Sequence, residues 1–322
     1  MTGKSLGQYF FVAYIFNTFD SKHINMSDRK MKTIIIGYYL LPYMGGKSRI
    51  GKFIMDYIPT DTKIYVEVFG GMFWVYFNLD LDKYDKLEKV VYNDFNPLNA
   101  NLFRCVRNHE RFRDELKDYI KEYQKRFGPN VFKEFQQEIF SPDFKINSRT
   151  NDYETAFKYA YVLTQVYSGA NPEKATYVRK HKNDTQNKLV LGPLKNKLDN
   201  QKWKNHFDKI TDTKKMDFED LIKQYDSPNT FFYCDPPYYG KEHYYSNHEF
   251  GLDSHERLAD CLKKIKGKFA LSYYDFDKLS QWFPKDKFNW QQKDFTKASG
   301  GSKSKGTEIL IMNYTKAKKK RK

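Results

Sequence analysis

Short apolar runs in this chain end in glycine or in polar residues, and helix-like segments separate the runs. The endings are Gly70-Gly71 after residues 64–69, Asn93-Asp94 after residues 89–92, and Asp235-Pro236-Pro237-Tyr238 after residues 230–234. Alternation of buried strands and helices is typical of a doubly wound α/β sheet, whose ligands bind at the carboxyl ends of the strands. We therefore expect the three endings to share one edge of such a sheet.

Hydrophobic periodicity predicts the elements around these endings. Helices are expected over 50–58, 72–79 and 216–225, and another helix is expected to begin at the capping-box pair Asp253 and Glu256. Two further strands are expected over 268–273 and 308–314. Residues 297–306 are rich in glycine, serine and lysine, which indicates a loop.

The segment between residues 97 and 198 differs from its surroundings. It is strongly charged, with amphipathic helices expected over 109–127 and 152–167 and a basic stretch without clear period over 171–188. The sequence thus predicts a sheet domain made of residues 36–97 and 199–315, with a helical insert at 98–198. Residues 1–35 are interpreted as an extension, and residues 316–322 as a basic tail.

Charge and cysteine content limit the class of protein. The net charge is +16, from 56 basic and 40 acidic residues, which favours a polyanionic partner such as nucleic acid; the alternative is a basic protein without such a partner. The 3 cysteines lack zinc-site spacing, so we expect no metal, reduced thiols and a cytoplasmic protein. The apolar stretch 9–19 is too short to cross a bilayer, so no membrane partner is expected.

The segment Asp235-Pro236-Pro237-Tyr238 has the residue types that hold a flat group bearing an amine. Two prolines fix two φ angles and remove two backbone donors, which leaves nearby carbonyls available to a ligand. A carboxylate and these carbonyls accept the amine hydrogens, and the tyrosine ring stacks on the flat group. The alternative is a proline-rich turn, which is less consistent with a position directly after a strand.

Two upstream endings suggest a nucleotide-like ligand. Gly70 and Gly71 allow close backbone approach, and an acidic residue such as Asp94 after the second strand suits ribose hydroxyls, although it can equally cap a helix. The chain lacks the G-x-G-x-x-G phosphate fingerprint in this region, which argues against an oxidoreductase that uses a dinucleotide.

The chain resembles the Dam-type family of DNA adenine methylases. The matching segments occur in the family's order: Tyr43-Met44-Gly45-Gly46-Lys47, Val66-Glu67-Val68-Phe69-Gly70-Gly71, Asn93-Asp94-Phe95-Asn96, Asp217-Phe218, Asp235-Pro236-Pro237-Tyr238 and Thr307-Glu308-Ile309-Leu310-Ile311-Met312-Asn313-Tyr314. Tyr43 stands where a tryptophan is usual. Met72 stands where the family has a small residue, so it narrows the expected cofactor pocket.

This resemblance implies a Rossmann-like methyltransferase sheet whose insert at 98–198 recognises DNA. It implies site-specific transfer of a methyl group from S-adenosylmethionine to adenine N6 in double-stranded DNA. The amine of adenine is a poor nucleophile, because its lone pair is delocalised into the ring. Acceptors on both of its hydrogens localise the lone pair and stabilise the positive charge that develops during transfer.

The resemblance and the motifs together assign roles to individual residues. The catalytic residues are Asp235, Pro236, Pro237 and Tyr238. The residues expected to bind the cofactor are Tyr43, Gly45, Gly46, Lys47, Glu67, Phe69, Gly70, Gly71, Asp94, Phe95, Asp217, Phe218 and Asp235. Lys47 is the candidate ligand for the methionine carboxylate, and its alternative is a surface loop lysine.

DNA contacts are expected from the basic part of the insert and from the loop 297–306. The candidates are Tyr177, Arg179, Lys180, Lys182, Asn183, Lys303 and Lys305, and the alternative is that these segments are solvated loops. A cognate restriction endonuclease is a candidate partner, and a monomer or weak dimer is expected. Two other functions stay open: a degenerate protein that binds DNA or cofactor without turnover, and a methyltransferase that acts on adenine in RNA.

Overall fold

The computed structural model describes residues 39–43, 45–47, 50–147, 149–166, 170–178, 191–240, 250–299 and 302–315, without the side chains of 296–299 and 302–305. Its contacts separate Met1–Ile35 from the compact unit Ile36–Lys322. The predicted extension 1–35 and the predicted basic tail 316–322 lie outside the described residues.

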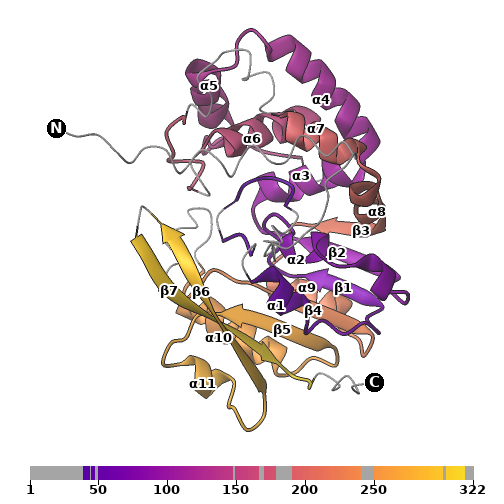
Figure 1. The fold of residues 1–322 in the computed structure, drawn as a ribbon, viewed down its shortest axis with the longest axis vertical. Coiled ribbons are helices and arrows are strands. Elements are labelled where there is room, and N and C mark those ends of the chain that lie inside the picture. The colour runs from indigo at the N-terminus through magenta and orange to yellow at the C-terminus, as the bar shows by residue number, and fades with distance from the viewer. Residues whose placement is uncertain are drawn as a thin grey trace, which may run out of the picture. The chain divides into compact units, whose positions relative to one another are not determined.

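A seven-stranded sheet forms the centre of this unit, with the strand order β3-β2-β1-β4-β5-β7-β6 (Figure 1). The strands are β1 (Ile64–Glu67), β2 (Lys89–Asn93), β3 (Ile210–Lys214), β4 (Thr230–Cys234), β5 (Lys268–Tyr273), β6 (Asn289–Ser299) and β7 (Ser302–Met312). The pairs from β3 to β5 are parallel, and β7 runs antiparallel to both β5 and β6. The predicted α/β fold is therefore confirmed.

Alternation along the strands places apolar side chains on both faces of the sheet. Tyr65 belongs to one buried cluster, whereas its neighbour Val66 belongs to another on the opposite face. Phe231 and Phe232 of β4 divide between the same two clusters. Both faces are thus covered, as a parallel sheet requires, and the ends of its strands are left for ligands.

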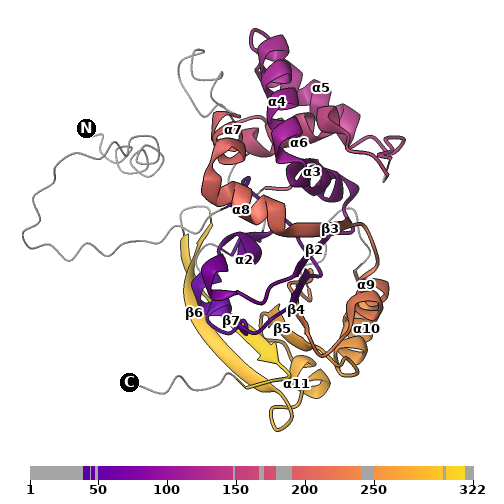
Figure 2. The ribbon, with the colours of Figure 1, turned by 90° about the vertical axis from the view of Figure 1, so that its right-hand side faces the viewer.

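Helices cover each face (Figure 2). One face packs against α1 (Gly51–Met55) and α2 (Trp74–Phe77), and the other against α9 (Phe218–Tyr225), α10 (Leu252–Leu262) and α11 (Leu279–Trp282); a 3-10 turn spans Leu81–Lys83. The predicted capping box of Asp253 and Glu256 is wrong. The N-cap of α10 is Gly251 and has no side-chain hydrogen bond, because Asp253 already lies inside the first turn.

In the described part of the chain, six helices lie between β2 and β3. They are α3 (Pro97–Arg107), α4 (His109–Tyr123), α5 (Pro129–Ile139), α6 (Tyr153–Gln165), α7 (Gly192–Asp199) and α8 (Gln201–Lys209). The most buried of them, α6, packs against α3, α4 and α5, which explains why most of its side chains are buried. Asp152 caps α6 by accepting the backbone N–H of Thr155. Helix α3 contacts both the sheet and α6.

The described residues of the predicted loop, 297–299 and 302–306, are strand instead. They continue a long hairpin in which β6 and β7 pair from Asn289↔Met312 to Ser299↔Ser302. The prediction failed because strand formation here depends on backbone pairing with the neighbouring strand, and glycine, serine and lysine do not reveal that pairing. Lys303 and Lys305 therefore lie on β7. Among the described residues, no helix is long and apolar enough to cross a membrane.

Candidate functional site

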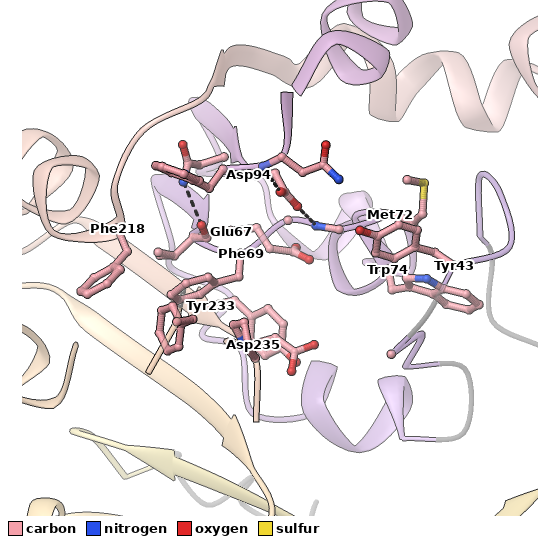
Figure 3. A pocket seen from close by; sticks show the side chains of 18 of the residues that line it. Tyr43, Glu67, Phe69, Met72, Trp74, Asp94, Phe218, Tyr233 and Asp235 are labelled. Carbon is pink, nitrogen blue, oxygen red and sulfur yellow. Dashed lines mark hydrogen bonds between the residues drawn. The ribbon is translucent and has the colours of Figure 1, made fainter. Parts of the chain in front are cut away.

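The carboxyl ends of β1, β2 and β4 open on a cavity of about 430 Å³ (Figure 3). These three strands are neighbours in the sheet, so residues far apart in the sequence meet at one edge. The predicted catalytic and cofactor residues that line the cavity are Tyr43, Gly45, Lys47, Glu67, Phe69, Gly70, Gly71, Asp94, Phe95, Asp217, Phe218, Asp235, Pro237 and Tyr238. Gly46 and Pro236 are not among the lining residues.

Glycine is required at positions 70 and 71 for different reasons. A Cβ on Gly70 would lie 2.3 Å from the ring of Tyr92 and 2.8 Å from the Asn93 carbonyl oxygen, so the turn packs tightly against β2. Gly71 has φ +48°, in the left-handed region that favours glycine. Its carbonyl accepts the Tyr92 hydroxyl at 2.8 Å. The turn after β1 is therefore held open toward the cavity.

Asp94 joins the end of β2 to this turn. Its Oδ2 accepts the Gly71 N–H at 2.7 Å and the Asn99 amide at 3.1 Å, and its Oδ1 accepts the Asn96 N–H at 2.8 Å. Burial raises the pKa of Asp94, while these donors oppose that rise. Asn99 also donates to the Tyr43 hydroxyl at 3.0 Å, so two predicted cofactor residues share one amide.

Three phenylalanines form an aromatic wall of the cavity. Phe69 lies after β1, Phe218 begins α9 and Phe250 precedes α10, with ring centroids 5.6 to 5.8 Å apart. The Arg257 guanidinium lies over the Phe218 ring at 4.9 Å and donates to Asp217 at 3.0 Å. The wall offers flat apolar surface with a cation on one side, which suits a planar heterocycle.

The motif 235–238 lies at the other side of the cavity, beside a buried ion cluster. Lys47 Nζ is 2.8 Å from Asp235 Oδ1 and 3.5 Å from Glu308 Oε1, and it also donates to the Tyr238 hydroxyl. The Tyr238 hydroxyl is 3.0 Å from both Asp235 Oδ1 and Glu308 Oε1. The contacts of the Asp235 carboxylate with Lys47 and with Tyr238 are both made by Oδ1.

Burial dominates the electrostatics of the cluster. It raises the pKa of Asp235 and of Glu308, and the Lys47 ammonium opposes the rise at both groups. Burial also raises the pKa of Tyr238 far above its usual value, so its hydroxyl stays protonated. The ammonium of Lys47, which is expected to hold the methionine carboxylate of a cofactor, lies against the carboxylate of Asp235.

Glu67 is a further buried carboxyl at this edge of the sheet. Its side chain accepts the Tyr65 hydroxyl at 2.7 Å, and burial raises its pKa well above the usual value. A nearby Asp235 charge adds to that rise. A neutral Glu67 beside Asp235 would avoid placing a further charge in the same apolar surroundings.

Sequence reasoning missed part of the lining. The helical segment between β2 and β3 contributes Phe140, Tyr159, Asn171, Pro172 and Glu173, and the sheet unit contributes Trp74, Asn93, Met216, Tyr233, Ser254 and Arg257. Of these, Asn93 had a visible signal, because it directly precedes Asp94. Met72, which the sequence indicated would narrow the pocket, also lines the cavity. Gln136 holds the segment around 172 by donating to the carbonyls of Pro172 and Ala175 at 2.7 and 2.9 Å.

The predicted DNA-binding residues lie elsewhere or outside the described residues. The Tyr177 ring packs edge-on against Phe132 of α5 at 5.6 Å. Arg179, Lys180, Lys182 and Asn183 lie outside the described residues, as do the side chains of Lys303 and Lys305. Within the part of the chain that is described, no group of three or more His, Cys, Asp and Glu side chains is arranged to hold a metal ion.

Comparison with known proteins adds independent information. The chain is 24% identical over 295 residues to the modification methylase StsI of Streptococcus sanguinis, which covers 85% of this chain and 42% of that protein. It is 23% identical over 234 residues to the type II methyltransferase M.CviBI of Paramecium bursaria Chlorella virus NC1A, covering 71% of this chain and 80% of that protein. This chain thus spans less than half the length of the first relative.

A family model for D12 class N6 adenine-specific DNA methyltransferases matches residues 43–298, from the tyrosine beside the cavity to the β6–β7 hairpin. The match contains Asp94, the motif 235–238 and the helical segment between β2 and β3. Because the match covers most of the chain and contains the cavity's central residues, this protein belongs to the D12 class N6 adenine-specific DNA methyltransferase family.

Proposed function

We propose that this protein transfers a methyl group from S-adenosylmethionine to the N6 atom of adenine in DNA. The observation that carries the proposal is that Asp235, Pro237 and Tyr238 share one cavity with Gly71 and Asp94. An amine-binding strand end and a nucleotide-like site thus face each other across a single space.

The cavity's residues fit the proposed cofactor. About 430 Å³ lies within the range of small-molecule sites, roughly 300–1,000 Å³. Phe69 and Phe218 would hold the cofactor's adenine, Asp94 the ribose hydroxyls, and the backbone at Gly71 would lie against the remainder. Tyr43 lies at the same opening and is held by Asn99.

When bound, S-adenosylmethionine supplies an electrophilic methyl group: the N6 lone pair forms the new N–C bond, the electron pair of the broken S–C bond returns to sulfur, and N6 gives up one proton. Asp235 Oδ2 accepts an N6 hydrogen and takes this proton. Pro236 has no backbone N–H, so the peptide group between Asp235 and Pro236 offers only a carbonyl oxygen to the amine. The Tyr238 ring supports the flat face of the base.

Lys47 would serve the acceptor side of the site in this scheme. Its ammonium holds Asp235 Oδ1 at 2.8 Å, so Oδ2 would be the oxygen that accepts the amine. With Oδ1 fixed by Lys47 and Tyr238, the carboxylate has one orientation in which to accept the amine. Preorganised acceptors of this kind need no rearrangement when charge develops.

We assign the catalytic and DNA-binding parts of the chain as the sequence predicts them. Residues 36–97 and 199–315 form the catalytic domain in this proposal, and residues 98–198 recognise the target. The family name supports DNA as the substrate class, and the net charge of +16 supports a polyanionic partner. Duplex DNA buries the adenine amine in the base pair, so the enzyme must extrude the base, at a cost of about a few kcal/mol.

A methyl-transfer assay tests the proposal. We expect label from S-adenosylmethionine to enter unmodified duplex DNA as N6-methyladenine, and Asp235→Ala to abolish incorporation while cofactor binding persists. Absence of label from every DNA tested, with intact cofactor binding, would indicate a binding protein instead. If RNA is labelled in preference to duplex DNA when both are present, the substrate is RNA rather than DNA.

A further inference from the structure

Glu308 is a buried acidic residue in an otherwise apolar part of β7. Its side chain is 1% exposed, and its strand neighbours Ile309 and Leu310 belong to the two apolar clusters. A buried carboxyl is costly unless it is paired or hydrogen-bonded. The partners of Glu308 are Lys47 at 3.5 Å and the Tyr238 hydroxyl at 3.0 Å, both of which line the cavity. Glu308 therefore occupies a position that favours apolar side chains, and its carboxyl group is directed at the site.

The Tyr238 hydroxyl is held from two sides. It lies 3.0 Å from Asp235 Oδ1 and 3.0 Å from Glu308 Oε1, and it accepts a hydrogen bond from Lys47. A phenol has a single proton and donates it to one carboxylate at a time. The contacts on both sides nevertheless restrict the hydroxyl, and with it the tilt of the ring.

The cluster holds more acidic than basic groups. Lys47 contributes one positive charge, and Asp235 and Glu308 contribute one negative charge each when both are ionised. Without Glu308, Lys47 and Asp235 would form a neutral pair. With it, the cluster has an excess of one negative charge, in surroundings that screen charge weakly.

We propose that Glu308 is a positioning residue of the methyl-transfer site, which fixes the Tyr238 ring and gives the Lys47–Asp235 pair an excess of negative charge. The inference rests on the proposed function. During transfer, positive charge moves from sulfur to the adenine amine beside Asp235. A fixed negative charge behind Asp235 stabilises the cationic amine without contacting it.

The charged and titratable groups around Glu308 determine how the pH dependence of activity changes when Glu308 is replaced. They are Lys47, Asp235, Tyr233, Tyr238 and Tyr274, with Ser272 as a further hydrogen-bonding neighbour and Glu67 next to Asp235. The Asp235 charge raises the pKa of Glu308, and Lys47 lowers the pKa of both groups. In Glu308→Gln the repulsion disappears and Lys47 acts on Asp235 alone, so the pKa of Asp235 falls.

The first test is the pH profile of kcat for the full-length wild type and Glu308→Gln. We expect kcat to fall about tenfold or more, with a smaller change in the KM for S-adenosylmethionine, and the acidic limb to move to lower pH. The matched control is Thr307→Val, which alters the adjacent residue on the opposite face of β7, where Thr307 donates to Asp294 at 2.7 Å. The control should keep the wild-type profile.

A second variant separates positioning from general damage. Tyr238→Phe removes the hydroxyl and retains Glu308, and we expect it to lower kcat as well. If Glu308 acts partly through that hydroxyl, the double variant will lose less activity than the product of the two single losses. Independent, multiplicative losses together with an unmoved acidic limb would overturn the proposal.

A measurement that needs no activity distinguishes failure of this inference from failure of the proposed function. Because burial raises the pKa of Glu308, the folded protein keeps the Glu308 proton at pH values where the unfolded chain has already lost it, so folding stability falls as pH rises above the ordinary pKa of a glutamate. The thermal midpoint of the wild type should thus fall more steeply than that of Glu308→Gln just above that pKa, and the two slopes should become equal at higher pH, where Glu308 is ionised in the folded protein as well. A difference in slope that persists up to about pH 8 would show a neutral Glu308 and refute the fixed negative charge, even if no methyl transfer is found.

Discussion

Asp94 Oδ2 accepts the backbone N–H of Gly71 at 2.7 Å, so the end of β2 is bonded directly to the turn that follows β1. Asn96 and Asn99 donate to the same carboxylate, and the Tyr92 side chain is a further hydrogen-bonding neighbour that lowers the pKa of Asp94. These groups fix the carboxylate beside the cavity that Asp94 lines. Asp94 would therefore have two roles in the proposed site, since it shapes the glycine turn and would also contact the cofactor.

Asp94→Asn should damage both roles. The amide would place an N–H donor against the donors that now bind the carboxylate, and hydrogen bonds to a charged group contribute about 1.5–3 kcal/mol each. We expect the dissociation constant for S-adenosylmethionine, measured by calorimetry, to rise about tenfold or more. Asp85→Asn, at an exposed residue outside the cavity, should bind as the wild type does. Equal affinity in the two variants would remove Asp94 from the cofactor site.

Gly70→Ala should destabilise the fold. The new methyl group would meet the Tyr92 ring at 2.3 Å and the Asn93 carbonyl at 2.8 Å, and the carbonyl belongs to the backbone of β2, which cannot move freely. Overpacking of this kind costs about 1–3 kcal/mol. Gly51→Ala is the matched control, because a Cβ there has no neighbour within 4 Å and alanine favours the helix. Thermal melts of the two variants should shift in opposite directions; a harmless Gly70→Ala would show that the turn is not tightly packed.

Arg257 supports the aromatic wall by lying over the ring of Phe218. Removing it in Arg257→Ala leaves Phe218 without the guanidinium over its ring and Asp217 without its ion pair. Because the side chain is 40% exposed, we expect a modest loss, about two- to fivefold in S-adenosylmethionine affinity. Lys223→Ala is the control, since Lys223 binds Glu219 from the exposed surface. Fluorescence titration would measure the S-adenosylmethionine affinity of both variants. Equal losses of affinity would mean that the removed positive charge alone explains the effect.

Lys197 of α7 gives the fold a defined alkaline pH dependence. It donates to the carbonyls of Tyr39 and Leu40 at 2.6 and 2.8 Å, and burial lowers its pKa to about 8 from 10.5. Between those values the unfolded chain binds more protons than the folded chain, so stability increases with pH. Urea unfolding should show the wild type gaining stability relative to Lys197→Met across this interval. A constant difference would indicate an unshifted pKa.

The sequence predicts those parts of the site that depend on local signals. Apolar runs that end in Gly70-Gly71, Asp94 or Asp235 identify strand ends, and the order of the strands in a doubly wound sheet brings such ends together. These predictions needed only the identity of the neighbouring residues. The residues reach the same cavity, although their individual roles stay proposals.

Other features are not shown by local sequence. The polar end of the β6–β7 hairpin is formed through backbone pairing, and α10 begins after Gly251, which has no side chain that could signal a cap. Glu308 within an apolar strand does signal a buried partner. Its partner Lys47 lies near the other end of the chain, and only the folded sheet shows which cation that is.

The antiparallel insertion of β7 next to β5 has a consequence for the order of folding. Lys47 and Glu308 meet only after β7 has docked, although a ribosome makes Lys47 long before it makes β7. Contacts between segments so distant in the chain form late, because the loop between them must first close. A nascent chain that ends before β7 would thus present the glycine turn without the complete ion cluster. The enzyme would gain its transfer chemistry only once the final strand of the sheet is in place.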